Sequence, residues 1–367
     1  MNDGPAATVP TPGVSNPSMS TEPSADTRQD GAELWRDTRR NVEINVGKIC
    51  NNKCVFCLDG LPATEMRRYM PWPDMQAEIL RWYENGNRSL GFLGGEPTTY
   101  PWILDGIRYA RDLGYTRIAL ATNGTKFFRH DFVDKVLDAG LTRVTMSMHG
   151  HTPALEDALT RVPGNFEKKK SGLLYLLKKR DEGHLRDNVS VNIVVNAWNY
   201  KHLPAILKFF YELGMDDVRA NFVRAEGYAE TETSLIPTYT EVVPYVVKAI
   251  LLNEYKYKRT FTLGGFPLCV LPLTLVSSRT MARRYVGEFR DLDTDCSIRT
   301  LSAEGFPEGI AKVEGGRARF NWQERKRHDL KRHVKACERC AYTDVCEGTW
   351  KEYLGIHGEG ELRPIPG

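Results

Sequence analysis

An α/β fold, made of a partial (βα)6 barrel and a C-terminal cysteine-rich domain, is predicted by three features of the sequence. Between residue 42 and about residue 224, short β-branched or apolar runs alternate with longer amphipathic stretches, which is typical of βα units around a parallel sheet. The eight cysteines fall into two groups separated by about two hundred residues. A hydrophobic fraction of 41% and a charged fraction of 26% are ordinary for a chain that buries a core.

The elements of the barrel follow from these runs in chain order. Six strands are predicted at the β-branched or apolar runs, residues 42–46, 90–93, 117–121, 143–148, 189–195 and 218–222. Helices are predicted over the amphipathic stretches between them, residues 74–83, 102–113, 131–139, 166–179 and 203–213. Gly114, Gly140 and Gly214 follow three of these stretches and are typical helix ends. Six such units can curl into a partial barrel, in which chemistry collects at the loops after the strands.

The chain is expected to divide into three parts. Residues 1–31 are rich in Pro, Ser, Thr, Ala and Gly, with almost no large apolar side chains, so they are predicted to be a disordered tail. Residues 32–235 are assigned to the barrel, because the alternating pattern ends shortly before residue 235. Residues 236–367, which begin with a helix near 241–252 and end in a basic, cysteine-bearing stretch, form the second domain.

Composition and charge exclude several classes of partner. No run approaches the roughly 20 apolar residues needed to cross a bilayer, and the N-terminus lacks the basic start and apolar core of a signal peptide. We therefore expect a cytoplasmic protein with no membrane partner. The net charge of +3 is small, and the basic runs at residues 168–170 and 325–333 are interpreted as solvated faces, so no nucleic-acid partner is expected.

Chemically distinctive residues fall directly after the predicted strands. Three cysteines follow the first strand, Gly94-Gly95-Glu96-Pro97 the second, Thr122-Asn123-Gly124 the third, and His149-Gly150 the fourth. Because the carboxyl ends of parallel strands meet at one edge of a barrel, we expect these segments to surround a common site.

The first cysteine group, Cys50-x3-Cys54-x2-Cys57, supplies three thiolates within eight residues. An iron–sulfur cluster of four irons usually takes four cysteines, so three would leave one iron open to an external ligand. A structural zinc site would require a fourth ligand nearby, and the nearest candidates, His130 and His149, belong to other units. A 4Fe-4S cluster with one open iron is therefore the favoured interpretation.

The triplet, with Phe56 before its last cysteine, and the Gly94 to Pro97 segment together resemble the radical SAM superfamily. The resemblance covers roughly residues 40–235 and implies a partial βα barrel. It also implies that the open iron binds the amino and carboxylate groups of S-adenosylmethionine (SAM), whose reductive cleavage gives a 5′-deoxyadenosyl radical. The cofactor then carries the difficult chemistry, while the protein positions a C–H bond.

The same resemblance implies a set of SAM contacts. The backbone of the glycine segment would receive the methionine amino group, where a side chain would block close approach. Phe56 would lie near the adenine, and Ser147 and Arg161 would bind the methionine carboxylate and the ribose, with a planar guanidinium suited to a carboxylate. The alternatives are that Asn123 only makes a turn and that Arg161 is solvated. The complete set is Phe56, Gly94, Gly95, Glu96, Asn123, Ser147 and Arg161.

The second cysteine group, Cys337-x2-Cys340-x5-Cys346, resembles part of the SPASM pattern of auxiliary 4Fe-4S clusters. A further cysteine would follow four residues after Cys346, where this chain has Trp350, and none lies beyond. The resemblance therefore implies a shortened, twitch-like auxiliary domain with one cluster. A structural zinc knuckle is the competing interpretation, because Cys-x2-Cys pairs are frequent zinc ligands.

The fourth ligand of that cluster must come from upstream, from Cys269 or Cys296. Cys269 is preferred, because its place soon after the barrel resembles the first auxiliary-cluster cysteine of the family. Cys296 would then be free, either as a small buried hydrophobe or as a catalytic residue that returns a hydrogen atom to a substrate radical.

The leading hypothesis is a radical SAM enzyme that abstracts hydrogen from a peptide or natural-product substrate, giving a cross-link, an epimerisation or an oxidation. Its cofactors would be the SAM-binding 4Fe-4S cluster, SAM and one auxiliary 4Fe-4S cluster, and its electron donor a flavodoxin or ferredoxin. The rival class is a non-catalytic iron–sulfur protein that transfers electrons or carries clusters. Such a protein would explain the cysteines but not Gly94 to Pro97, Ser147 and Arg161 in their loops.

Overall fold

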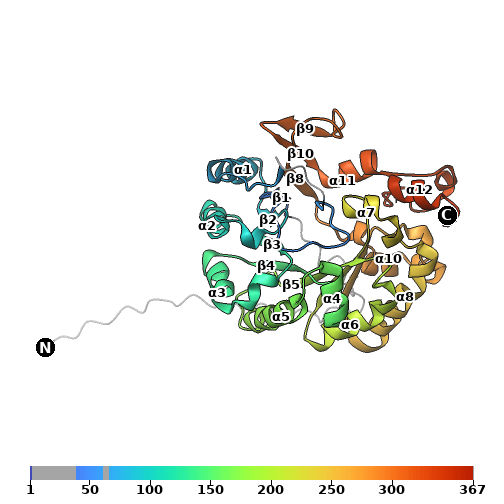
Figure 1. The fold of residues 1–367 in the computed structure, drawn as a ribbon, viewed down its shortest axis with the longest axis horizontal. Coiled ribbons are helices and arrows are strands. Elements are labelled where there is room, and N and C mark those ends of the chain that lie inside the picture. Colours follow the sequence, from blue (N-terminus) through green and yellow to red (C-terminus); the bar gives the residue numbers. More distant parts are fainter. Residues whose placement is uncertain (2–38, 61–65, 367) are drawn as a thin grey trace. The chain divides into compact units, whose positions relative to one another are not determined.

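The structure, a computed structural model, describes residues 1, 39–60 and 66–366. The tail predicted for residues 1–31 lies, apart from Met1, outside the described residues. All helices and strands described below belong to the unit Arg36–Gly367 (Figure 1).

A ten-stranded sheet is the framework of this unit, with the strand order β7-β6-β5-β4-β3-β2-β1-β8-β10-β9. Its first six strands in chain order pair in parallel, each with the next, at the positions predicted from the sequence. They are β1 (Asn41–Asn45), β2 (Ser89–Leu93), β3 (Arg117–Thr122), β4 (Arg143–Ser147), β5 (Val189–Val195) and β6 (Asp217–Phe222). The predicted α/β fold with a parallel partial barrel is confirmed.

The sheet extends beyond the predicted six strands at both edges. A seventh parallel strand, β7 (Thr260–Gly264), pairs with β6. At the other edge β8 (Thr294–Arg299) pairs in parallel with β1, and the antiparallel β10 (Arg317–Asn321) and β9 (Ala311–Glu314) follow it. The separate strands β11 (Lys331–Arg332) and β12 (Thr349–Trp350) pair with each other. The domain division near residue 235 stays a prediction.

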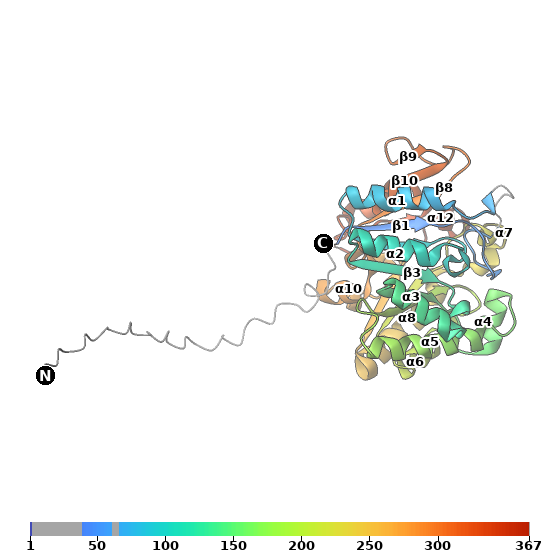
Figure 2. The same ribbon diagram turned by 90° about the vertical axis from the view of Figure 1, so that its left-hand side faces the viewer.

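Helices cover the outer side of the parallel strands, as Figures 1 and 2 show for α1, α2, α3, α5 and α6. Six helices match the predicted ones: α1 (Trp72–Glu84), α2 (Ile103–Leu113), α3 (His130–Ala139), α5 (Asn165–Asp181), α6 (Leu203–Glu212) and α8 (Tyr239–Leu252). Gly114 and Gly140 end α2 and α3 with positive φ angles of 102° and 116°. The helices that were not predicted are α4 (Pro153–Thr160), α7 (Tyr228–Thr231), α9 (Leu273–Val276), α10 (Arg279–Tyr285), α11 (Trp322–Arg325) and α12 (Lys351–His357).

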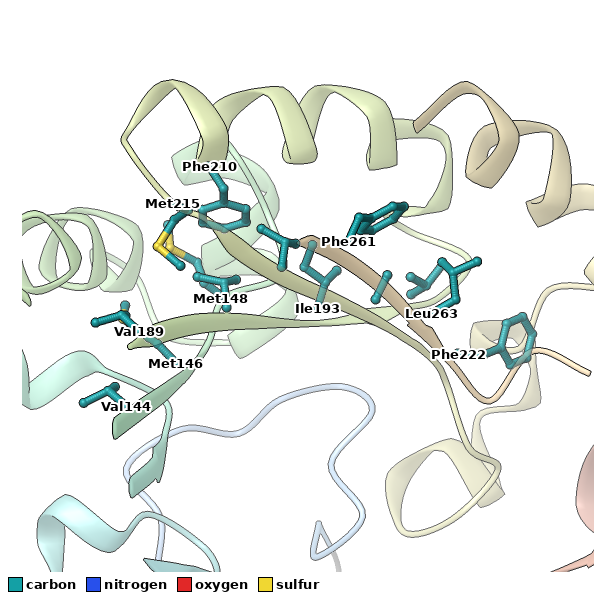
Figure 3. Close-up of a cluster of buried hydrophobic side chains, with 14 of the residues drawn as sticks. Val144, Met146, Met148, Val189, Ile193, Phe210, Met215, Phe222, Phe261 and Leu263 are labelled. Atoms are coloured by element: carbon teal, nitrogen blue, oxygen red, sulfur yellow. The ribbon is translucent and has the colours of Figure 1, made fainter. Parts of the chain in front are cut away.

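The main core lies between the strands and these helices (Figure 3). Alternate residues of each strand point to this side, so Val144 and Met146 of β4 are fully buried and pack in one cluster with Phe210 of α6 and Phe261 of β7. Burying one side chain of this size stabilises the folded state by about 1.5–3 kcal/mol. The alternation of apolar and polar residues along each strand therefore follows from the burial of one face against the helices.

The opposite, inner face of the strands is polar. In β4 the residues between the core positions are Arg143, Thr145 and Ser147, and Arg143 forms a 2.8 Å ion pair with Asp217 of β6. In β5 the inner position Asn192 accepts a hydrogen bond from Asn221 of β6. A barrel interior lined by such groups can surround a polar cofactor or substrate.

One long helical segment differs from the sequence expectation. Residues Thr233–Tyr257, which include α8, are long and apolar enough to cross a membrane by length and composition. The sequence analysis was wrong to find no such run. In the fold α8 belongs to the core, because Val242, Val246 and Ile250 are buried and the helix packs against α6. A core helix of a soluble protein passes the same composition test.

Candidate functional site

The loop after β1, residues 46–60 (the cysteine loop), carries Cys50, Cys54 and Cys57. Its backbone is held by the end of α4, because the N–H groups of Lys53 and Val55 donate to carbonyl oxygens of α4 at 3.1 and 3.0 Å. Helix α4 begins with Thr152 as its N-cap and Pro153 in its first turn, a helix-start signal that the sequence analysis passed over.

The thiols of the cysteine loop do not ionise readily by themselves. Burial raises the pKa of Cys54 to about 12 and that of Cys57 to about 11. Iron is bound by the thiolate, so a metal must displace these protons on binding. Cys50 accepts hydrogen bonds from the backbone N–H of Asn52 at 3.3 Å and from the side-chain amide of Asn123 at 3.7 Å. Such N–H donors to sulfur tune iron–sulfur sites.

The Gly94–Gly95 segment packs directly against the start of the cysteine loop. The N–H groups of Gly95 and Glu96 donate to Gly47 and Ile49 at 2.7 and 2.8 Å. A Cβ atom at Gly95 would lie 2.3 Å from the carbonyl oxygen of Ile49, and Gly94 has φ +140°. The glycine segment and the start of the cysteine loop are therefore held in close backbone contact.

The carboxylate of Glu96 is a structural anchor between the second and third loops. It is 1% exposed and accepts hydrogen bonds from Thr98, from the Thr122 hydroxyl at 2.6 Å and from the Asn123 backbone at 2.6 Å. A buried carboxylate is tolerated when such donors surround it. Glu96 therefore fixes Asn123, whose side chain also donates to Asn51 of the cysteine loop at 2.7 Å. Asn123 is thus more than a turn residue.

A fully buried ion pair supports the loop after β4. Lys169 and Glu156 have completely buried side chains and lie 2.6 Å apart. Lys169 also donates to the carbonyl oxygen of Ser147 at 3.0 Å. Glu156 accepts from the backbone N–H groups of His149 and Gly150 at 2.6 and 2.7 Å. Lys169 was interpreted as part of a solvated basic run, which is wrong for this residue.

His149 is a buried, hydrogen-bonded residue. Its Nδ1 accepts the backbone N–H of Val194 at 3.0 Å, and burial lowers its pKa to about 4, so the ring is neutral at pH 7. The ring of Phe56 meets it edge-on, with the ring centroids 4.7 Å apart. The structure thus joins the aromatic residue of the cysteine loop to the end of β4.

Arg161 has an unusual backbone conformation for a non-glycine residue, with φ +54° at the end of α4. Its guanidinium lies 5.5 Å from the ring centroid of Tyr228. The N–H of Tyr228 donates to the carbonyl oxygen of Cys57 at 3.1 Å. Left-handed backbone at such a residue is associated with functional sites, and here it holds Arg161 beside the segment that contacts the cysteine loop.

The second cysteine group forms a separate site. Cys269, Cys337, Cys340 and Cys346 line one small pocket. Burial raises the pKa of Cys269 to about 12 and of Cys346 to about 11, and Cys346 accepts the N–H of Gly348 at 3.4 Å. Of the two upstream candidates, the structure brings Cys269 to the C-terminal group.

Cys296 lies elsewhere, on β8. It is 7% exposed, stands opposite Glu43 of β1 and Phe320 of β10 in the sheet, and packs in a small cluster with Phe320. Burial and the neighbouring carboxylate of Glu43 raise the pKa of its thiol.

A parallel barrel that carries three thiols on its first loop and a glycine–glutamate segment on its second defines a class of cofactor-binding barrel. Residues 44–210 match the family model of the radical SAM superfamily.

Curated relatives share the barrel region. A probable GTP 3′,8-cyclase of Metallosphaera sedula is 24% identical over 219 residues, which cover 59% of this chain and 66% of the relative. An AdoMet-dependent heme synthase of Methanosarcina barkeri is 28% identical over 201 residues, 53% of each chain. The chain thus spans just under two thirds of the first relative and about half of the second.

Solved structures share the fold over more of the chain. Streptococcus suis SuiB bound to S-adenosylmethionine has a TM-score of 0.59 and 16% identity, covering 90% of this chain and 76% of SuiB. SuiB bound to its precursor peptide SuiA has a TM-score of 0.51 and 18% identity, and the match covers 71% of this chain and 57% of SuiB. Native anSMEcpe with bound AdoMet has a TM-score of 0.56 and 13% identity, and the match covers 88% of this chain and 93% of anSMEcpe.

Proposed function

We propose that this protein is an enzyme that reductively cleaves SAM and abstracts a hydrogen atom from a peptide or natural-product substrate. The observation that carries the proposal is the contact between the cysteine loop and the Gly94–Glu96 segment, two motifs that lie about forty residues apart in sequence. A protein that only carried clusters would have no need for this second motif.

The residues of the first site fit a three-cysteine cluster and SAM. Cys50, Cys54 and Cys57 would hold the iron, and the carbonyl oxygens of the glycine segment would accept from the methionine amino group. Ser147 and Arg161 would bind the carboxylate and ribose, and Phe56 would lie beside the adenine. When bound, the cluster and SAM supply the radical that removes hydrogen from the substrate.

The second site fits one auxiliary 4Fe-4S cluster with Cys269, Cys337, Cys340 and Cys346 as ligands. A structural zinc site with the same four thiolates is the alternative. An auxiliary cluster could remove an electron from the substrate or bind it.

A peptide substrate is supported by the structural neighbours, since SuiB has been solved with a precursor peptide. Because two curated relatives are named for GTP and heme, a small-molecule substrate is the alternative to a peptide. The reaction outcome would be a cross-link, an epimerisation or an oxidation, with a flavodoxin or ferredoxin as electron donor.

Iron content tests the two-cluster proposal. We expect about eight irons per chain in the anaerobically reconstituted protein and about four in the Cys50→Ala/Cys54→Ala/Cys57→Ala variant, with Mössbauer spectra of 4Fe-4S clusters, because each 4Fe-4S cluster carries four irons. The matched Cys337→Ala/Cys340→Ala variant should also retain about four. Four irons in the wild type and none in the triple variant would remove the auxiliary cluster from the proposal.

Cys296 is proposed to return a hydrogen atom to the substrate radical, because it stands beside Glu43 of β1 in the sheet. We expect Cys296→Ala to release 5′-deoxyadenosine normally while losing product formation, measured by mass spectrometry. Full product formation in Cys296→Ala would overturn this role.

A further inference from the structure

Two side-chain hydrogen bonds join the cysteine loop to the outer helix layer. Asn51 donates to the Thr125 hydroxyl at 2.8 Å, and Asn52 accepts from Asn165 at 2.9 Å. Thr125 begins the short helix η4 (Thr125–Phe128), and Asn165 begins α5. These two helices pack against each other. The cysteine loop therefore lies beside the part of the protein surface that η4 and the start of α5 form.

This part of the surface combines exposed apolar side chains with unpaired cations. Phe128 of η4 is 47% exposed, and Leu174 of α5 is 44% exposed. The Lys168 ammonium lies 5.9 Å from the Phe128 ring centroid, and the Lys170 ammonium lies 6.0 Å from that of Phe166. Neither lysine has an ion-pair partner among the described residues. We call Phe128, Lys168, Lys170 and Leu174 the α5 surface.

An open groove between α3 and α5 continues the α5 surface, and Figure 2 shows the two helices side by side. Lys170 and Lys178 line the groove together with Leu174, and Glu167 is the carboxylate among its lining residues. His130 forms part of its wall and stacks on Tyr175, with the ring centroids 4.1 Å apart. The groove thus presents more cationic than anionic groups to solvent.

The charge of α5 does not serve the stability of the helix. The helix carries six Lys or Arg residues against two acidic residues, Glu167 and Asp181. Lys168 and Lys170 stand near its N-terminus, where the helix dipole disfavours cations. Two unpaired cations at this end gain nothing from the fold, so their place indicates an anionic partner from outside the chain.

The other basic run, residues 325–333, offers less free charge. Lys326 and Lys331 were interpreted as solvated, which is wrong, because both are buried and pair with Glu347 at 2.6 and 2.7 Å. Arg325 pairs with Asp329 at 3.2 Å. Of the two basic runs, the one on α5 is therefore the better candidate for a charged contact.

The position of the α5 surface indicates the kind of partner. Reductive cleavage of SAM requires an electron from outside the chain, and the cysteine loop lies beside this surface. Electron-transfer proteins meet through small, transient interfaces that bury less than about 1,200 Å². Opposite charges on the two partners speed their encounter. Nucleic acid is also polyanionic, but it carries no electron for a cluster.

We propose that the α5 surface is the docking site of a small acidic electron-carrier protein that reduces the cluster of the cysteine loop. The inference rests on the proposed function and names the partner surface of that site. In the step, the carrier is oxidised by one electron and the 4Fe-4S cluster is reduced by one electron, and no atom or proton is transferred. Phe128 and Leu174 form the apolar centre of the contact, and Lys168 and Lys170 attract carboxylates of the carrier.

The test uses the anaerobically reconstituted full chain with SAM and an acidic flavodoxin in its reduced form. Oxidation of the flavin is followed by stopped-flow absorbance. We expect Lys168→Glu/Lys170→Glu to lower the second-order rate about tenfold or more, because it turns attraction into repulsion. The wild-type rate should also fall between about 0.1 M and about 1 M salt, where the screening length shrinks from about 10 Å to about 3 Å. Release of 5′-deoxyadenosine driven by excess dithionite should stay unchanged.

The matched control is Lys248→Glu/Lys256→Glu, which changes the net charge by the same amount at the far end of α8 and just after it. The two ammonium groups lie 5.0 and 4.9 Å from the ring centroids of Tyr245 and Tyr257, much as the two lysines of the α5 surface lie over aromatic rings. This variant should react with flavodoxin like the wild type. Iron content establishes that each variant carries its clusters.

Equal flavodoxin rates in the three proteins would overturn the inference, and so would an equal loss of the flavodoxin-driven and the dithionite-driven reactions in Lys168→Glu/Lys170→Glu. Binding of a poly(U) probe that this variant loses, with unchanged flavodoxin rates, would assign the surface to nucleic acid instead. If the wild type releases no 5′-deoxyadenosine even with dithionite, the proposed function itself fails. If it does, and the flavodoxin rates do not respond to the two lysines, only this inference fails.

Discussion

Cys54→Ala is expected to reduce 5′-deoxyadenosine release to the level of a control without enzyme. Cys54 lies in the middle of the cysteine loop, which α4 holds through Lys53 and Val55. Without Cys54 the cluster would lose one of its three thiolates. No neighbouring residue can replace it, because the described part of this loop holds no other cysteine. The nucleoside is measured by chromatography after anaerobic incubation with SAM and dithionite.

The matched control is Cys337→Ala/Cys340→Ala, which removes two thiols from the other cysteine site. Because the two cysteine groups are separate, this variant should still release 5′-deoxyadenosine while failing to convert substrate. Equal release by Cys54→Ala and wild type would contradict the assignment of the cysteine loop as the SAM-cleaving site. Loss of release in both variants would mean that the two sites depend on each other for assembly.

Local patterns were sufficient for the six parallel strands β1 to β6 but not for the strands that complete the sheet. The run Val189–Val195 is β-branched and bounded by polar residues, so its strand could be recognised directly. Strand β8 has the sequence TDCSIR, which resembles a loop, and it becomes a strand only because β1, about 250 residues earlier, offers it an edge. Pairing over such separations leaves no periodic signal in the sequence.

The two cysteine motifs could be recognised from the sequence because the cysteines of each motif lie within ten residues of one another. The choice between Cys269 and Cys296 required the fold, because both lie far from the C-terminal group in sequence. Buried lysines were missed altogether. Lys169, in a run of three lysines, and Lys331, in a basic stretch, resemble surface residues, and only their partners Glu156 and Glu347 make their burial possible.

Lys169→Met should destabilise the folded protein by about 3–5 kcal/mol, because removing one partner of a buried ion pair leaves the other charge uncompensated. Burial by itself would raise the pKa of Glu156, yet Lys169 keeps this pKa below its usual value. Without the ammonium, the carboxylate keeps only the N–H groups of His149 and Gly150. The measurement is urea unfolding of the anaerobic protein at pH 7.

Lys170→Met provides the matched control, because it removes a positive charge from the next residue on α5, one that lines an open surface groove. A surface change of this kind should alter stability by less than about 0.5 kcal/mol. The double variant Lys169→Met/Glu156→Gln should recover part of the loss, since a neutral amide no longer requires a countercharge. If Lys169→Met and Lys170→Met unfold at the same urea concentration, the buried pair does not support the loop after β4. The position of Ser147 would then have to depend on the pairing of β4 with its neighbours β3 and β5.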